Sequence, residues 1–356
     1  MQPSKINNFD GLRLLAALQV VFIHTSEHLH LAYSHSASLF LSFINFFPGV
    51  PIFFTISGFL ITWSFERDKD QLLKFYRNRF IRIFPALWMC VLITVFVLLI
   101  FHTITLNQLF SKTMTAWWMG QVTVFQFYTP DILRNFGVGT PNGSLWTIAI
   151  EVQFYVIVPV LYYLFFKFYS KESIRYAWIF LVIGSSIVAY VYANSLTEEN
   201  LWRKLMGVFL LPYLYNFIFG MIIYKNWNFL KELLCNKAGY WLFIYSVYTF
   251  VGSTWLGLYA PSYWPNAVGF IANALLSFTV ISIAYTLPLS SERLLKGNDF
   301  SYGIYIYHMI VVNVMVQMGY LTNRWYLAVV FSLTFLLAIG SWFWIEQPAL
   351  RWKSRR

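Results

Sequence analysis

Charged residues and cysteines are both scarce in this chain. Lysine, arginine, aspartate and glutamate make up 11% of the 356 residues, whereas about 25% is usual in a soluble domain. The only two cysteines, Cys90 and Cys235, lie in an apolar run and a basic stretch, so we expect no disulfide. These shortages exclude a soluble enzyme, a disordered protein and a disulfide-rich secreted scaffold.

Hydrophobic residues reach 59% and aromatic residues 21%, and they are grouped in long apolar runs. A membrane-spanning helix needs about 20 mostly apolar residues, and ten segments satisfy this length. The fold class predicted is therefore an all-α, polytopic transmembrane helix bundle. The first segment carries Arg13, Gln19 and His24 and lacks a cleavage site, so we expect a retained helix and no signal peptide. The ten segments are 10–29, 46–65, 83–103, 145–166, 176–194, 205–224, 239–258, 266–288, 301–320 and 326–345.

The net charge of +11 is interpreted as a signal for the direction in which the helices insert into the membrane. Twenty of the 25 lysines and arginines fall at one set of helix ends, which predicts that these ends, and both termini, are cytoplasmic. The basic excess therefore predicts contact with membrane lipids and no nucleic-acid partner. We expect one domain, 1–356, with a long outer loop at 104–144 and a short basic tail at 346–356. Such a loop is either functional or an interfacial helix held by Trp117 and Trp118.

Ionisable groups inside a membrane helix are costly and usually face a cavity or a partner. Arg13 and His24 are eleven residues apart, so they share one helix face about 16 Å apart along the axis. The alternative is a snorkelling arginine and a structurally bonded histidine. Glu151 lies about 9 Å, and His24 about 7 Å, below the same outer boundary. A carboxylate beside an imidazole fixes its tautomer and raises its basicity, so we predict a His24–Glu151 pair; Glu151 could instead order the outer loop.

Two further features lie in the remaining segments. The basic stretch after the second segment places Arg79 and Arg82 in an inner loop, three residues apart, and arginine forks suit phosphates. The alternative is positive-inside charge alone. His308 lies inside the ninth segment and is either functional or a bonded core histidine. No histidine or cysteine spacing fits a trusted zinc pattern, so no metal is expected.

Five elements in chain order resemble the integral-membrane acyltransferase-3 family, from about residue 6 to 348. The segment at 49–60, Gly-Val-Pro-Ile-Phe-Phe-Thr-Ile-Ser-Gly-Phe-Leu, includes Ser57. Departures are Pro51, Thr147 and Val152, none of which removes a predicted catalytic group. The other matching elements are Arg13 with His24, Arg79 with Arg82, Leu145-Trp146-Thr147 through Glu151 and Tyr155, and Ser301 through Tyr305 to His308.

The resemblance implies transfer of an acyl group, usually acetyl, from cytoplasmic acetyl-CoA to a hydroxyl of a surface or secreted glycan or glycolipid. It implies that Arg79, Arg82 and Arg13 bind the phosphates of the acetyl-CoA donor. It also implies that the protein lies in a bacterial inner membrane. We assign His24 as general base with Glu151 orienting it; a covalent acyl-histidine remains an alternative. The oxyanion donor is unassigned, with Ser57, Asn142 and Ser144 as candidates. Trp146, Tyr305 and His308 are expected to bind the substrate or support the site.

Two other functions are compatible with the same residues. A transporter or flippase for a glycolipid or acyl carrier would use His24 and Glu151 as a proton relay. An inverted repeat would support it, and the sequence shows none. A purely structural membrane partner leaves the Arg13–His24 alignment without a purpose. The acceptor, the acyl length and the oligomeric state are not determined by the sequence.

Overall fold

The computed structural model describes residues 3–4, 6–34, 41, 43–126, 128–166, 172–197, 199–252 and 267–354. Within these ranges the regular structure is helical and contains no strand, as predicted. The part of the 239–258 segment beyond residue 252, residue 266, and the last two residues of the tail lie outside them. The main helices are α1 (Phe9–His28), α3 (Gly49–Asp68), α4 (Leu72–Ile100), α6 (Lys112–Val122), α7 (Trp146–Phe166), α8 (Glu172–Ser195), α9 (Leu201–Gly207), α10 (Leu214–Lys225), α11 (Trp227–Leu234), α12 (Ala238–Phe250), α13 (Ala267–Ala284), α14 (Ser290–Leu295), α15 (Ser301–Gln317), α16 (Trp325–Ser341) and α17 (Gln347–Ser354).

Each of the ten predicted segments contains a helix in the structure, but their lengths differ. Four helices among the described residues are long and apolar enough to cross a membrane on their own: Phe43–Asp68, Leu72–Ile100, Gly143–Phe166 and Trp325–Trp352. Leu201–Gly207 and Leu211–Lys225 would make a fifth span if taken together, with a bend of 52°. The chain is an integral membrane protein, and the count of ten spans and the side of its termini remain predictions.

The basic segment after α3 is helical, so the predicted loop is wrong. α4 begins at Leu72, eleven residues before the predicted start of the third segment, and continues without interruption past Pro85. Arginine and lysine are good helix formers, and the missing amide of Pro85 did not end the helix. Arg79 and Arg82 therefore lie on one face of a regular helix, as their spacing requires.

The helices group into two compact units by their contacts, and each is described separately. Unit 1 comprises residues 1–16, 39–76 and 150–297, and unit 2 comprises 17–38, 77–149 and 298–356. α1, α4 and α7 each supply residues to both units. His24 and His308 belong to unit 2, whereas Arg13, Ser57 and Glu151 belong to unit 1.

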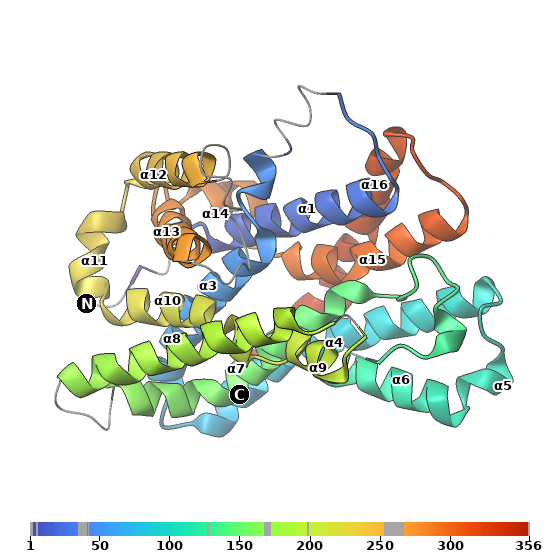
Figure 1. The fold of residues 1–356 in the computed structure, drawn as a ribbon, viewed down its shortest axis with the longest axis horizontal. Helices are drawn as coiled ribbons and strands as arrows, with labels where there is room; N and C mark the ends of the chain where they lie inside the picture. The colour runs from blue at the N-terminus through green and yellow to red at the C-terminus, as the bar shows by residue number, and fades with distance from the viewer. Residues whose placement is uncertain are drawn as a thin grey trace. The chain divides into compact units, whose positions relative to one another are not determined.

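Unit 1 is built around the contact between α3 and α10 (Figure 1). Gly58 and Gly220 lie at this crossing. A Cβ at Gly58 would be 2.1 Å from the carbonyl oxygen of Phe217, and one at Gly220 would be 2.2 Å from that of Thr55. The two backbones touch because neither glycine has a side chain, which is how small residues bring membrane helices together. The glycine of the Ser-Gly-Phe-Leu element is thus required by packing.

Unit 2 contains the hairpin of α15 and α16 and the second half of α1, from residue 17 onward (Figure 1). The turn between α15 and α16 meets the end of α1, where Thr322 N donates to Leu29 O at 2.7 Å. At the opposite end of α15, Asp299 pairs with Arg82 of α4. Helix ends predicted to be outer therefore contact each other, and so do ends predicted to be inner. Which of the two sets of ends is cytoplasmic stays a prediction.

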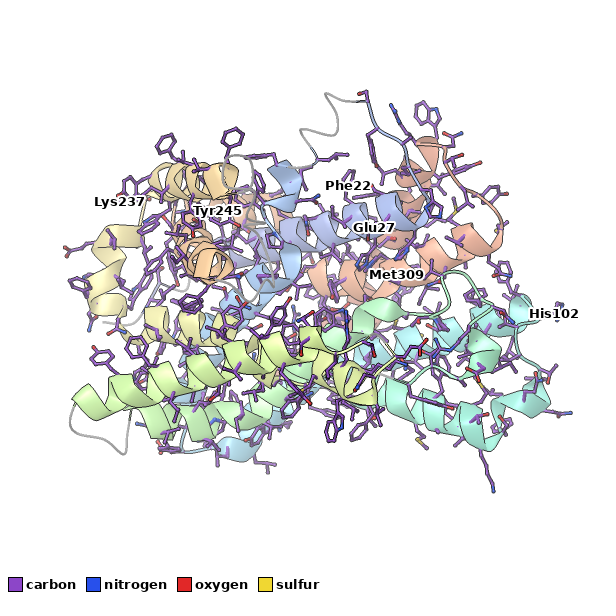
Figure 2. The ribbon with its side chains drawn as sticks, viewed as in Figure 1. Phe22, Glu27, His102, Lys237, Tyr245 and Met309 are labelled. Carbon is purple, nitrogen blue, oxygen red and sulfur yellow. The ribbon has the colours of Figure 1, made fainter. Side chains whose placement is uncertain are left out.

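The long connection at 104–144 contains secondary structure of its own. α6 lies within it, and Trp117 of α6 is buried with Leu98, Met114 and Phe136 in a hydrophobic cluster of unit 2. Figure 2 labels His102 in the turn that leads into this connection. The segment at 346–356, predicted as a tail, contains α17, which follows a π-helical turn at Trp342–Glu346.

Candidate active site

The side chain of His24 is bonded to another histidine. Its Nδ1 lies 2.9 Å from Nε2 of His308, and the two ring planes are inclined by 24° with centroids 5.1 Å apart. His24 is half-buried, and His308 is completely buried. Figure 2 labels Glu27 on α1 and Met309 on α15, close to these two histidines in sequence. The structure thus joins two predicted site residues that are 284 positions apart.

The turn of α15 that carries His308 is held by the segment at 142–147. His308 Nδ1 lies 2.7 Å from the carbonyl oxygen of Tyr305, and the hydroxyl of Ser144 donates to the same oxygen at 3.3 Å. The Tyr305 hydroxyl and that of Thr147 are 2.8 Å apart. Asn142 Nδ2 donates to the carbonyl oxygen of Ile306 at 2.8 Å. These contacts connect two of the family elements within unit 2.

Glu151 has hydroxyl partners within unit 1. Its Oε1 accepts from the hydroxyl of Ser57 at 2.9 Å and from that of Tyr155 at 2.5 Å. Two hydroxyl donors on one carboxylate oxygen fix the orientation of the Glu151 side chain. Because His24 lies in the other unit, the structure does not test the predicted His24–Glu151 pair.

The predicted oxyanion donors are already hydrogen-bonded inside the protein. The hydroxyl of Ser57 donates to Glu151, and that of Ser144 donates to Asn142 and Tyr305. The amide of Asn142 donates to Ile306 O and to the sulfur of Cys90. Trp146 begins α7 directly after these residues. In these positions Asn142 and Ser144 stabilise the backbone of α15 through its carbonyl groups.

The predicted donor-binding arginines are distributed over both units. Arg82 of α4 is ion-paired with Asp299, whose carboxylate also accepts from the backbone amide of Ser301 at 3.1 Å. Arg79 lies on the same α4 face one turn earlier. Arg13 belongs to unit 1, where it pairs with Asp10 at 3.4 Å. A phosphate that binds Arg82 must share its guanidinium with Asp299.

Glu346 was not predicted as a site residue. It ends the π-helical turn Trp342–Glu346 and is 3% exposed. Its Oε1 accepts from Ser341 at 3.0 Å, and its Oε2 is buried without a hydrogen-bond partner among the described residues. The sequence signal that could have drawn attention to Glu346 was its position as a single acidic residue between an apolar segment and Pro348.

No cluster of three histidine, cysteine or acidic side chains suited to a metal ion occurs among the described residues. The histidines near the end of α1 are His24 and His28, whose ring centroids are 5.9 Å apart.

Comparison of the chain with known proteins shows which family it resembles. A family model described as an acyltransferase domain, acyltransferase-3, matches residues 6–343. Nodulation protein 10 of Rhizobium leguminosarum bv. viciae is 30% identical over 351 residues, which cover 97% of this chain and 93% of that protein. The O-acetyl transferase of Shigella phage Sf6 is 28% identical over 322 residues, covering 88% of this chain and 86% of the relative.

A third relative is considerably longer than the matched region. The peptidoglycan O-acetyltransferase OatA of Listeria monocytogenes is 25% identical over 371 residues, which cover 96% of this chain but only 55% of that protein. The chain thus spans about half the length of this relative. No solved structure matches the chain.

Helices long enough to cross a membrane, together with these matches, define an integral-membrane acyltransferase. The chain belongs to the acyltransferase-3 family, because the family model covers nearly all of it. With O-acetyltransferases among its relatives, it is an enzyme of that type. The resemblance indicated by the five sequence elements is confirmed.

Proposed function

We propose that this enzyme transfers an acetyl group from cytoplasmic acetyl-CoA to a hydroxyl of a glycan or glycolipid at the surface of a bacterial inner membrane. The observation that carries the proposal is the hydrogen-bonded imidazole of His24 in α1. A hydroxyl is a weak nucleophile at neutral pH, and a positioned base contributes about 10²–10⁴-fold to such a reaction. The Listeria relative, named for peptidoglycan, supports a glycan as the acceptor.

In this mechanism the acceptor hydroxyl gives its proton to His24 as its oxygen attacks the thioester carbonyl. The thioester carbon–sulfur bond then breaks, and the coenzyme leaves as a thiol after taking up a proton. We also place Glu151 in the active site. The hydroxyls of Ser57 and Tyr155 donate to its carboxylate and hold it in place. Arg79 and Arg82 are assigned to the donor phosphates because guanidinium forks match phosphate oxygens.

Purified protein supplied with radiolabelled acetyl-CoA tests the activity. Appearance of label in a glycan fraction, or its release as acetate, is the expected result. Movement of the intact labelled donor into vesicles with no cleavage of the thioester would instead support a transporter. Glycan analysis of a deletion strain against its parent then identifies the acceptor, as the sugar that has lost an O-acetyl group.

Replacing Arg82 by lysine tests the donor site. The Arg82→Lys variant keeps the charge beside Asp299 and loses the planar fork. Hydrogen bonds to charged groups contribute about 1.5–3 kcal/mol, so we expect the KM for acetyl-CoA to rise about 10-fold or more, with a smaller change in kcat. Initial rates at varied acetyl-CoA measure both constants.

The matched control for Arg82 is Arg134→Lys, at an exposed arginine of unit 2 that bonds to Asp131 at 3.3 Å. This variant should keep the wild-type KM. An unchanged KM in Arg82→Lys would contradict the assignment of Arg82 to the donor phosphates.

A further inference from the structure

His308 is a buried titratable group to which the proposed mechanism gives no role. Both of its ring nitrogens are in contact with a defined atom: Nε2 with Nδ1 of His24 at 2.9 Å, and Nδ1 with the carbonyl oxygen of Tyr305 at 2.7 Å. Its side chain is 0% exposed. Within unit 2 as described, no carboxylate contacts either imidazole ring.

The hydrogen-bond pattern determines where the protons lie. A carbonyl oxygen only accepts, so the proton on His308 must be on Nδ1. A charged imidazolium in this buried place would lack a counter-charge, and burying an unpaired charge is expensive. The Nε2 of neutral His308 therefore accepts, and the Nδ1–H of His24 donates to it. The remaining nitrogen of His24, Nε2, then carries the lone pair that a general base needs.

The surroundings of His308 make it a rigid support. Its acceptor, the Tyr305 carbonyl, also accepts from the hydroxyl of Ser144. The next carbonyl along α15, that of Ile306, accepts from Asn142 at 2.8 Å. A side chain that is held by fixed backbone groups can hold another in a productive orientation, and displacements of about 1 Å can cost about 10²-fold in rate.

We propose that His308 is the positioning residue of His24: it holds the His24 ring and its Nδ1–H tautomer, so that Nε2 faces the acceptor hydroxyl. This inference rests on the proposed role of His24 as base. It also assigns the orienting function to a residue other than Glu151. His24 has two ring nitrogens, and if one donates to His308 and the other takes the proton, none is left for an orienting carboxylate.

Two substitutions of His308 separate positioning from folding. Glutamine places an oxygen close to the position of imidazole Nε2 and can accept from His24, whereas leucine cannot. We expect His308→Leu to lower kcat about 10²-fold with little change in the KM for acetyl-CoA, and His308→Gln to recover much of that loss. A merely structural role would predict no rescue by glutamine and no selective effect on kcat.

Nitrogen-15 NMR of histidine-labelled full-length protein in lipid nanodiscs measures the tautomer directly, with the His24 signals identified from the His24→Asn variant. In the wild type we expect the proton of His24 on Nδ1, and in His308→Leu we expect it on Nε2. Finding it on Nε2 in the wild type would overturn the inference, even if a variant failed to fold.

The Glu151→Gln variant completes the test. It should leave the His24 tautomer unchanged, and a tautomer shift in this variant with none in His308→Leu would assign the orienting role to Glu151. An inactive His24→Asn combined with a fully active His308→Leu would refute only the role of His308. A fully active His24→Asn would refute the role of His24 as base, whereas a wild-type protein that cleaves no labelled acetyl-CoA would refute the proposed function itself.

Discussion

Replacing His24 by asparagine is expected to reduce acetyl transfer by about 10²–10⁴-fold, the usual contribution of a general base. The asparagine amide can still bond to His308, so the α1–α15 contact of unit 2 is kept while the basic nitrogen is lost. Turnover of labelled acetyl-CoA by protein purified from membranes measures the effect. Expression and thermal stability should remain close to those of the wild type.

The matched control is His102→Asn. His102 is an exposed histidine of the same unit, in the turn after α4, with a backbone φ of 51° that asparagine tolerates. It should transfer acetyl groups at the wild-type rate. If His24→Asn were as active as this control, the base would have to be another residue.

Introducing a methyl group at the α3–α10 crossing is expected to have the largest effect on stability. In Gly58→Ala the new Cβ would be 2.1 Å from the carbonyl oxygen of Phe217, and in Gly220→Ala it would be 2.2 Å from that of Thr55. The obstructing atoms belong to backbones of packed helices, so they cannot rotate away. Overpacking typically costs about 1–3 kcal/mol and occasionally more, so for a chain of 356 residues we expect the unfolding midpoint to fall by about 1–4 °C or more.

Gly184→Ala provides the control for the crossing. Gly184 is also in a helix of unit 1, α8, but a Cβ there would meet no atom within 4 Å. Alanine is favoured over glycine in a helix by about 1 kcal/mol, so this variant should unfold at the wild-type temperature or slightly above. Thermal unfolding monitored by size-exclusion fluorescence compares all three variants with the wild type. Equal midpoints would mean that α3 and α10 do not pack as described.

Much of the fold could be predicted from periodicity and composition. All ten apolar segments contain helices, and His24, Glu151 and His308 were singled out because polar groups are rare inside apolar helices. The boundaries of α4 were missed because the cluster of basic residues resembled a loop, although these residues favour helix. Gly58 was recognised as part of a family element, but its packing against Phe217 could not be anticipated.

The sequence by itself determined the membrane class, the family and the candidate side chains, because these depend on residue types and their local spacing. Only the tertiary structure decided which atoms bond to them. His24 was expected to pair with a carboxylate, and its partner within unit 2 is His308. Asn142 and Ser144 were candidates for the unassigned oxyanion donor, and in the structure they donate to the backbone of α15. Residues so distant along the chain form hydrogen bonds only when their helices pack together. The local sequence around each residue does not specify which helix it will pack against.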